Sequence, residues 1–203
     1  MTPERKVAAI ILAAGSSRRM GDRNKLTETI GGISLIRRAT QAALDAGCDD
    51  VVVVTGHDCG TVEPLISGLP VRINRNPDYS AGMSTSLQAG LAAISPSMDG
   101  AIILLADMPH VAAPLISRMI AEFRSNPQSS VIVPVYGGQR GNPVLWGLQH
   151  FSDLMQVRGD TGGRALLRSL ADDVGEIQMG DNSVFTDIDT PEDLREIRAR
   201  AGE

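Results

Sequence analysis

Four short stretches of the chain are apolar at consecutive positions and do not alternate with polar residues. They cover residues 7–12, 51–54, 101–105 and 131–133. A strand with apolar side chains on both faces is typical of a parallel sheet covered by helices, because neither face of such a sheet meets water. We therefore predict a buried parallel strand at each of these positions.

Between these stretches the apolar residues recur at helical spacing. The clearest pattern covers residues 33–46 and is followed by Gly47, a residue that commonly terminates helices. Further helices are predicted over residues 84–94 and 114–123. Strands that alternate with helices predict an α/β fold with three layers, in which a doubly wound, mostly parallel sheet has right-handed crossovers.

The pattern becomes less regular after Pro134. We predict a turn at residues 137–138, a short strand at 143–146, and helices near 162–170 and 191–200. No repeat, linker or low-complexity segment interrupts the chain. Residues 1–203 are therefore expected to form a single domain.

Composition excludes several classes of function. Hydrophobic residues make up 42% and charged residues 21% of the chain, which suits a globular domain with a full core. The net charge of −5 argues against a general nucleic-acid binder, and aromatic residues at 3% leave few surfaces for stacking bases. Cys48 and Cys59 are too few for a disulfide framework. The first apolar run is too short to span a membrane and no signal peptide is visible, so we expect a cytoplasmic protein without membrane or nucleic-acid partners.

The distribution of positive charge gives the first chemical signal. Lys6 and Lys25 are the only lysines among 19 Lys and Arg residues. Lys25 ends a glycine-bearing loop that follows the first predicted strand. A lysine ammonium is a compact point charge that suits a phosphate, whereas an arginine presents a wide planar fork. A loop between a strand and a helix can also direct backbone N–H groups at an anion.

This loop matches neither of two familiar phosphate-binding motifs. The spacing of its two glycines excludes GxxxxGK[ST], and GxGxxG is absent. Gly15 can turn the chain or let a ligand approach closely. Ser16 and Ser17 can donate to phosphate oxygens, while Arg19 and Lys25 can stabilise a leaving pyrophosphate. A solvated basic loop without a ligand is the alternative.

Two further segments carry polar groups at the ends of predicted elements. Gly82 precedes a helix whose first turn contains Ser84 and Ser86. These hydroxyls could hold a polar group of a ligand, or could simply cap the helix, which the segment alone favours. Asp107 directly follows a buried strand, where the ligand crevice of a doubly wound sheet lies. It could hold Mg²⁺ or cap the next helix.

A second carboxylate pair lies near the C-terminal end of the chain. Asp187 and Asp189 lie two positions apart in the sequence, and we expect only one of them to face the metal ion. Thr190 is predicted to cap the last helix, with Asp193 closing an arrangement like a capping box. His57, by contrast, is isolated in the sequence, which favours a surface or packing role.

The segment LAAGSSRRMG at residues 12–21, followed by Lys25, resembles the signature of nucleotidyltransferases that activate sugar phosphates, polyols and pterins. It is most similar to the molybdenum cofactor cytidylyltransferases, which transfer CMP from CTP to the phosphate of molybdopterin. The guanylyl relatives typically read LAGG where this chain has LAAG. Because the position of Ala14 lies near the base in these enzymes, the resemblance favours CTP.

The resemblance implies a role for each motif. Lys25, Arg19 and Asp107 would be catalytic, and Mg²⁺ would be held by Asp107 and by Asp189 in preference to Asp187. The nucleotide would contact Leu12, Ala13, Ala14, Gly15, Ser16, Gly82, Ser84 and Ser86.

Two segments resemble the acceptor site of the cytidylyltransferases. In residues 141–144, Asn142 replaces the histidine of a GHP motif and cannot carry a proton near neutral pH. Residues 158–164 match GDxGxR, and their glycines and arginine suit an acceptor phosphate. A glycine turn capped by Asp160 is the alternative. The implied acceptor residues are Asn142, Gly159, Asp160, Gly162 and Arg164.

The implied reaction is an in-line attack by the acceptor phosphate on the α-phosphorus of CTP, with release of pyrophosphate and no covalent enzyme intermediate. The partners would be CTP and molybdopterin, together with a molybdenum hydroxylase as client. Three alternatives stay open. They are a guanylyl- or other nucleotidyltransferase of the same fold, a non-catalytic carrier of the molybdenum cofactor, and an oxidoreductase, which the missing GxGxxG disfavours.

Overall fold

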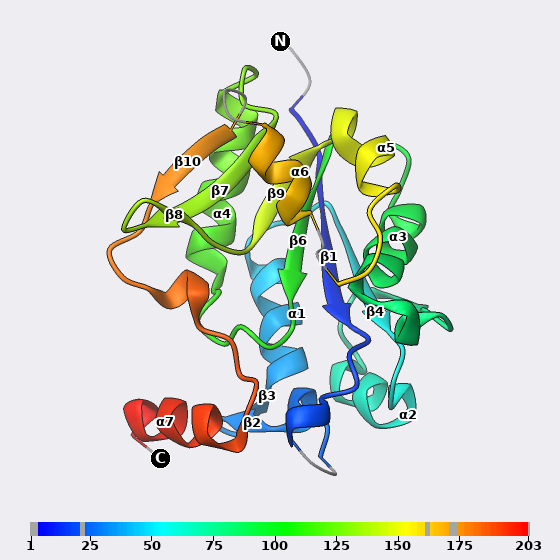
Figure 1. Ribbon diagram of the computed structural model, residues 1–203, viewed down its shortest axis with the longest axis vertical. Helices are drawn as coiled ribbons and strands as arrows, with labels where there is room; N and C mark the ends of the chain where they lie inside the picture. The colour runs from blue at the N-terminus through cyan, green and yellow to red at the C-terminus, as the bar shows by residue number, and fades with distance from the viewer. Residues whose placement is uncertain (1–3, 21–22, 161–162, 171–173, 203) are drawn as a thin grey trace.

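A computed structural model describes residues 4–20, 23–160, 163–170 and 174–202 (Figure 1). Its main sheet has the strand order β10-β7-β9-β6-β1-β4-β5, with β8 paired to β7, and a separate hairpin joins β2 to β3. The strands of the main sheet are β1 (Val7–Ala13), β4 (Asp50–Thr55), β5 (Arg72–Arg75), β6 (Gly100–Leu105), β7 (Val131–Tyr136), β8 (Gln139–Arg140), β9 (Val144–Gly147) and β10 (Val174–Gln178). The hairpin consists of β2 (Thr29–Ile30) and β3 (Ile33–Ser34).

The described helices follow the predicted alternation. They are α1 (Leu35–Asp45), α2 (Cys59–Val62), α3 (Met83–Ala93), α4 (Ala113–Ser125), α5 (Phe151–Leu154), α6 (Arg164–Ser169) and α7 (Pro191–Ala201). Short 3₁₀ turns are η1 (Arg18–Met20), η2 (Lys25–Thr27), η3 (Glu63–Ile66), η4 (Tyr79–Ala81), η5 (Leu148–His150) and η6 (Ser183–Phe185). None of the helices in the described ranges is long and apolar enough to cross a membrane.

The sheet is mostly parallel, which confirms the predicted fold class. β1 pairs in parallel with both β4 and β6, and β10 pairs in parallel with β7. The strand predicted at residues 143–146 is β9, which runs antiparallel between β6 and β7. From β1 the chain first builds outward through β4 and β5, and then builds in the other direction from β6. The strand order therefore reverses at β1, and a ligand crevice is expected at the carboxyl ends of β1 and β6.

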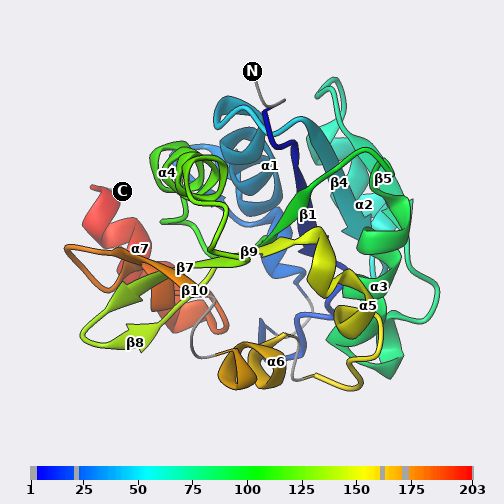
Figure 2. The same ribbon diagram turned by 90° about the horizontal axis from the view of Figure 1, so that it is seen from above.

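Helices cover both faces of the sheet, as Figure 2 shows, with α1 and α4 on one side and α3, α5 and α6 on the other. The side chains of β1 alternate between the two layers. Val7, Ala9 and Ile11 belong to one core cluster, and Ala8 and Ile10 belong to the other. All five are fully buried, which explains why the strand is apolar at every position.

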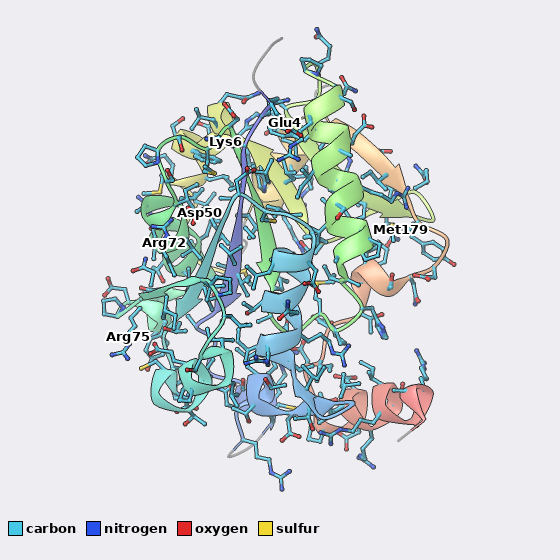
Figure 3. All side chains as sticks on the ribbon, turned by 180° about the vertical axis from the view of Figure 1, so that it is seen from behind. Glu4, Lys6, Asp50, Arg72, Arg75 and Met179 are labelled. Carbon is cyan, nitrogen blue, oxygen red and sulfur yellow. The ribbon has the colours of Figure 1, made fainter. Side chains whose placement is uncertain are left out.

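The two-residue strands β2, β3 and β8 were not predicted, and β5 and β10 were missed because they lie at the edges of the sheet. β5 reads Arg-Ile-Asn-Arg, and β10 is polar at several positions, so neither forms an apolar run. The arginines of β5 are paired with acids on neighbouring elements: Arg72 pairs with Asp50, and Arg75 pairs with Glu63 at 2.7 Å. Figure 3 shows Arg72 beside Asp50 at this outer edge.

Helix α3 packs closely against the centre of the sheet through Gly90. A Cβ atom added at Gly90 would lie 2.3 Å from Cγ2 of Ile10, which is fully buried and cannot easily move. We predict that Gly90→Ala lowers the free energy of unfolding by about 1–3 kcal/mol, although alanine is the better helix former. Urea denaturation would measure the change. Gly60→Ala is the control, because a Cβ there meets nothing within 4 Å. Equal stability of the Gly90 variant and wild type would contradict this packing.

Candidate active site

Three charged residues from distant parts of the chain meet at the carboxyl edge of the sheet. Nζ of Lys25 donates a hydrogen bond to Oδ2 of Asp107 at 2.5 Å and another to Oδ1 of Asp189 at 2.9 Å. Lys25 begins η2, Asp107 follows β6, and Asp189 precedes α7. In Figure 1 the arrowheads of β1 and β6 point toward this end of the molecule, where α7 and the β2–β3 hairpin lie. The structure therefore brings together the ammonium and the two acids that the sequence singled out.

The segment that carries Asp189 is held in place by its buried neighbour. The backbone N–H of Ile188 donates to the carbonyl of Asp107 at 3.0 Å, and the Ile188 side chain is fully buried. It packs in a small cluster with Met20, Ile30, Leu35, Leu194 and Ile197. The predicted capping box is confirmed: the Thr190 hydroxyl accepts the N–H of Asp193, whose carboxylate accepts the N–H of Thr190. Local capping and apolar packing thus fix Asp189.

Four charges at this point balance one another. Arg19 donates to Oδ2 of Asp189 at 2.8 Å, so two cations face the carboxylates of Asp107 and Asp189. Burial alone would lower the pKa of Lys25, but the two carboxylates raise that pKa above its ordinary value. The ammonium is therefore charged at neutral pH. Arg19 is 70% exposed and Lys25 only 14%, so Lys25 forms the inner part of the site.

Asp187 lies at the margin of this cluster. Partial burial and then the charges of Asp189 and Asp107 raise the pKa of the Asp187 carboxyl. The carboxyl group of Asp187 thus interacts electrostatically with the carboxylates of Asp107 and Asp189, but it is Asp189 that shares the Lys25 ammonium with Asp107.

The donor set suits a divalent cation that also binds phosphate. Oδ1 of Asp107 is buried and has no hydrogen-bond partner among the described residues. Among all the residues that the structure describes, no group of three or more His, Cys, Asp or Glu side chains could hold a metal ion on its own. Mg²⁺ commonly binds to one or two carboxylates and completes its shell with phosphate oxygens and water. Asp107 and Asp189 fit that pattern.

The loop after β1 leaves room for a ligand at Gly15. This glycine is exposed, a Cβ added to it would meet nothing within 4 Å, and its φ angle is not left-handed. A turn therefore does not require glycine here, whereas close approach of a ligand is possible. The side chains of Ala13 and Ala14 are buried, so contacts from this part of the loop would come from the backbone. Ser16 is half-buried, and the hydroxyl of Ser17 is bonded to Asn24.

The predicted nucleotide and acceptor segments touch at the start of α3. The N–H of Met83 donates to the Asp160 carboxylate, and the N–H of Ser84 donates to the Gly159 carbonyl, both at 3.0 Å. A Cβ on Gly82, whose φ is 114°, would lie 2.9 Å from the carbonyl carbon of Gly159. Only glycine therefore fits at this junction.

The serines of α3 do not cap it. Gly82 is the N-cap residue and no side chain bonds the first turn from that position, so capping by Ser84 or Ser86 is wrong. The Asp160 carboxylate and the Gly159 carbonyl accept the free N–H groups of the first turn instead. Ser84 and Ser86 are buried, and the Ser86 hydroxyl accepts from the amide of Asn76 at 3.0 Å. Their contact with a nucleotide stays a prediction.

The other acceptor residues lie on separate elements. The N–H of Asn142 donates to the carbonyl of Val184 at 3.2 Å, which places Asn142 beside the segment that leads to Asp189. Arg164 is exposed at the start of α6. Gly162 lies outside the described residues.

Sequence reasoning missed a polar cluster beside the loop. The His57 ring is not isolated, because its Nε2 lies 3.2 Å from Oδ2 of Asp58 and its Nδ1 lies 3.5 Å from the Tyr79 hydroxyl. Asn24 is buried and its amide contacts Asp58. The position of Asn24 directly before Lys25 was the one available signal.

Altogether, the switch point of the sheet carries a basic loop and two acids, as in α/β proteins that bind a phosphate-bearing ligand with a divalent ion.

Comparison with known proteins agrees with this class. Residues 9–174 match the MobA-like NTP transferase domain. The chain is 30% identical over 194 residues to nicotine blue oxidoreductase from Paenarthrobacter nicotinovorans, covering 93% of this chain and 94% of that relative. It is 27% identical over 189 residues to the molybdenum cofactor cytidylyltransferase of Escherichia coli, with 93% of each chain covered. The chain therefore belongs to the MobA-like NTP transferase family and is a nucleotidyltransferase.

Solved structures match the fold along almost the whole chain. Rv0371c from Mycobacterium tuberculosis superposes with a TM-score of 0.84 at 24% identity, covering 97% of this chain and 100% of that one. A manganese complex of the same protein superposes with a TM-score of 0.81 at 24% identity, covering 96% of this chain and 98% of that one.

The shared ammonium should stabilise the folded protein. In Lys25→Met the two carboxylates lose their common cation and repel each other, so we expect the free energy of unfolding at pH 7 to fall by about 1–3 kcal/mol. Urea denaturation would measure this. Lys6→Met is the matched control, since Lys6 is the other lysine and is exposed; its effect should stay within about 0.5 kcal/mol. Equal effects of the two substitutions would show that Lys25 does not bridge the acids.

Proposed function

We propose that this protein transfers CMP from CTP to the terminal phosphate of molybdopterin and releases pyrophosphate. The single observation that carries the proposal is the Lys25 ammonium between Asp107 and Asp189, at the end of the loop that contains the uncrowded Gly15. Positive groups for a phosphate chain and acids for a divalent ion are thereby gathered at one point. The named activity of the E. coli relative supports the choice of donor and acceptor.

The proposed reaction needs no covalent enzyme intermediate. An oxygen of the acceptor phosphate attacks the α-phosphorus of CTP, a new P–O bond forms, and the bond to the bridging oxygen of pyrophosphate breaks in line with it. The electron pair leaves with pyrophosphate. Lys25 and Arg19 stabilise the negative charge that develops on that leaving group. The protein therefore acts by positioning and by charge neutralisation.

Asp107 and Asp189 would hold a divalent cation, for which we propose Mg²⁺. When bound, such an ion supplies positive charge to the phosphate oxygens of both substrates. The unpartnered, buried Oδ1 of Asp107 supports this role. The manganese complex of Rv0371c supports a divalent ion in a protein of the same fold.

Base and acceptor are assigned to two sides of the crevice. The backbone from Leu12 to Gly15, with Ser16, would contact the nucleotide, and Ala14 in place of a glycine favours cytosine. Gly82, Ser84 and Ser86 would line its ribose side. Asn142, together with the glycine-rich segment from Gly159 to Arg164, would hold the acceptor.

We further propose that residues 1–203 form one domain. The reaction would take place in the cytoplasm, where CTP is present, and its product would pass to a molybdenum hydroxylase.

A second candidate is favoured by the name of the relative at 30% identity, nicotine blue oxidoreductase. Under this alternative the chain would reduce a dye-like heterocycle. A change in absorbance with NADH or NADPH and such a dye would reveal it. A carrier of the molybdenum cofactor would bind molybdopterin without releasing pyrophosphate.

The decisive experiment measures pyrophosphate release with each nucleoside triphosphate and Mg²⁺, with and without molybdopterin. We expect release with CTP and molybdopterin together, at least roughly tenfold faster than with GTP or ATP. Label in the α-phosphate of CTP should appear on the pterin product. Equal rates with all triphosphates would refute the base assignment. Free labelled CMP would mean hydrolysis, and no release with any triphosphate would refute the transfer reaction.

Gly15→Ala tests close approach of the nucleotide to the loop. The φ angle of Gly15 and the space around it accept a methyl group, so stability should stay equal or rise by up to about 1 kcal/mol. The methyl group would occupy space needed by the ligand, and the affinity for CTP with Mg²⁺ should fall roughly tenfold. Titration calorimetry would measure the affinity. Gly180→Ala, another uncrowded glycine, is the control. Unchanged affinity in Gly15→Ala would exclude close approach at this position.

A further inference from the structure

Backbone strain beside the active site is concentrated at two residues. Among the described non-glycine residues, only Ser17 and Asp58 have positive φ angles, of 49° and 52°. The left-handed conformation costs an L-residue roughly 1 kcal/mol, so it persists only where surrounding contacts enforce it. Ser17 and Asp58 are distant in sequence, yet both contact the side chain of Asn24. One buried amide therefore links the two strained positions.

Asn24 is hydrogen-bonded at both ends of its side chain. Its Oδ1 accepts from the Ser17 hydroxyl at 3.3 Å and from the N–H of Leu26 at 3.0 Å. Its Nδ2 donates to Oδ2 of Asp58 at 3.4 Å. The Ser17 hydroxyl in turn accepts the N–H of Lys25 at 3.2 Å. The backbone N–H groups of Lys25 and of the next residue are thus both held by this network.

The carboxylate of Asp58 is diverted from its ordinary local use. Asp58 occupies the N-cap of α2, where an aspartate usually accepts an N–H of its own helix, but it makes no such bond. Its carboxylate instead contacts Asn24 and, at 3.2 Å, Nε2 of His57. The N–H of His57 donates to the carbonyl of Ala14 at 3.2 Å. The end of β4 is therefore joined to both ends of the loop between β1 and η2.

We infer that Asp58, acting through Asn24, is a positioning residue for Lys25. The Asp58 carboxylate holds the Asn24 amide, the amide fixes the first turn of η2, and that turn directs the ammonium between Asp107 and Asp189. A purely conformational role at Asp58 would be met by glycine, which adopts the left-handed region without strain. The side chain is therefore the part with the positioning role. Only the catalytic benefit of this positioning rests on the proposed function. The position of Lys25 itself can be measured without substrate.

The lysine content of the chain provides the measurement. Lys25 and Lys6 are the only lysines, and Lys6 is exposed at the start of β1, far from α7 and η2 (Figure 3). A brief reaction with an N-hydroxysuccinimide acetate ester, followed by mass spectrometry of the peptides, gives the acetylation rate of Lys25 relative to Lys6. In the wild type this ratio should be low, because Lys25 is 14% exposed and bonded to two carboxylates.

Two substitutions at Asp58 separate the side chain from the backbone. Asp58→Gly relieves the strain but removes the acceptor, and we expect the Lys25-to-Lys6 ratio to rise about fivefold or more as the loop opens. Asp58→Asn tolerates the left-handed conformation and keeps an oxygen for Asn24, so its ratio should stay within about twofold of wild type. Circular dichroism would verify that both variants are folded. A wild-type ratio in Asp58→Gly, or an equal rise in Asp58→Asn, would overturn the inference.

A double-variant cycle tests the proposed route through Asn24. Asn24→Ala should raise the ratio at least as much as Asp58→Gly, and combining the two should raise it no further, because both break the same chain of contacts. Multiplying effects would overturn the route. In the transfer assay, Asp58→Gly should lower kcat and Asp58→Asn should restore it. A changed acetylation ratio in a protein that releases no pyrophosphate would refute the proposed function and leave the positioning role intact.

Discussion

The site depends on one electrostatic arrangement: an ammonium held between two carboxylates at the edge of a sheet. Lys25, Asp107 and Asp189 are partly buried, and each would be poorly tolerated there without the others, because a partly buried charge needs an opposite charge close by. The arrangement also explains the use of lysine in a chain that otherwise relies on arginine. A compact ammonium fits between two carboxylates, whereas the wide guanidinium of Arg19 contacts Asp189 from the exposed side.

The topology of the sheet makes this arrangement possible. Because the strand order reverses at β1, the chain continues from β1 to β4 in one direction along the sheet and from β6 to β7 in the other, and a crevice is expected at the carboxyl ends of β1 and β6. Asp107 reaches the crevice at the end of β6. Asp189 reaches it because Ile188 is buried in a small apolar cluster with residues of α7, η1 and the β2–β3 hairpin. Apolar packing therefore places a charged group that no local pattern could place.

The contact between Gly82 and residues 159–160 has a consequence for the proposed chemistry. The segment assigned to the nucleotide and the segment assigned to the acceptor are in direct contact. The N–H groups of Met83 and Ser84 donate hydrogen bonds to the Asp160 carboxylate and the Gly159 carbonyl. Two substrates that react in line must lie close together, and this direct contact is consistent with neighbouring subsites. A substitution at the start of α3 would therefore affect both the nucleotide side and the acceptor side of the crevice.

The central strands, the main helices and the capping box of α7 were predictable from the sequence, because burial period and capping are local properties visible in consecutive residues. The edge strands β5 and β10 were not, since each is exposed enough to carry polar side chains. The motif residues were predictable as candidates, but their partners were not: Lys25 lies 82 positions from Asp107 and 164 from Asp189. The contacts of Asn24 with Asp58 and of Gly82 with Gly159 likewise join segments that only the folded chain brings together. Local patterns determine which elements form, whereas the pairing order of the strands decides which of their ends meet.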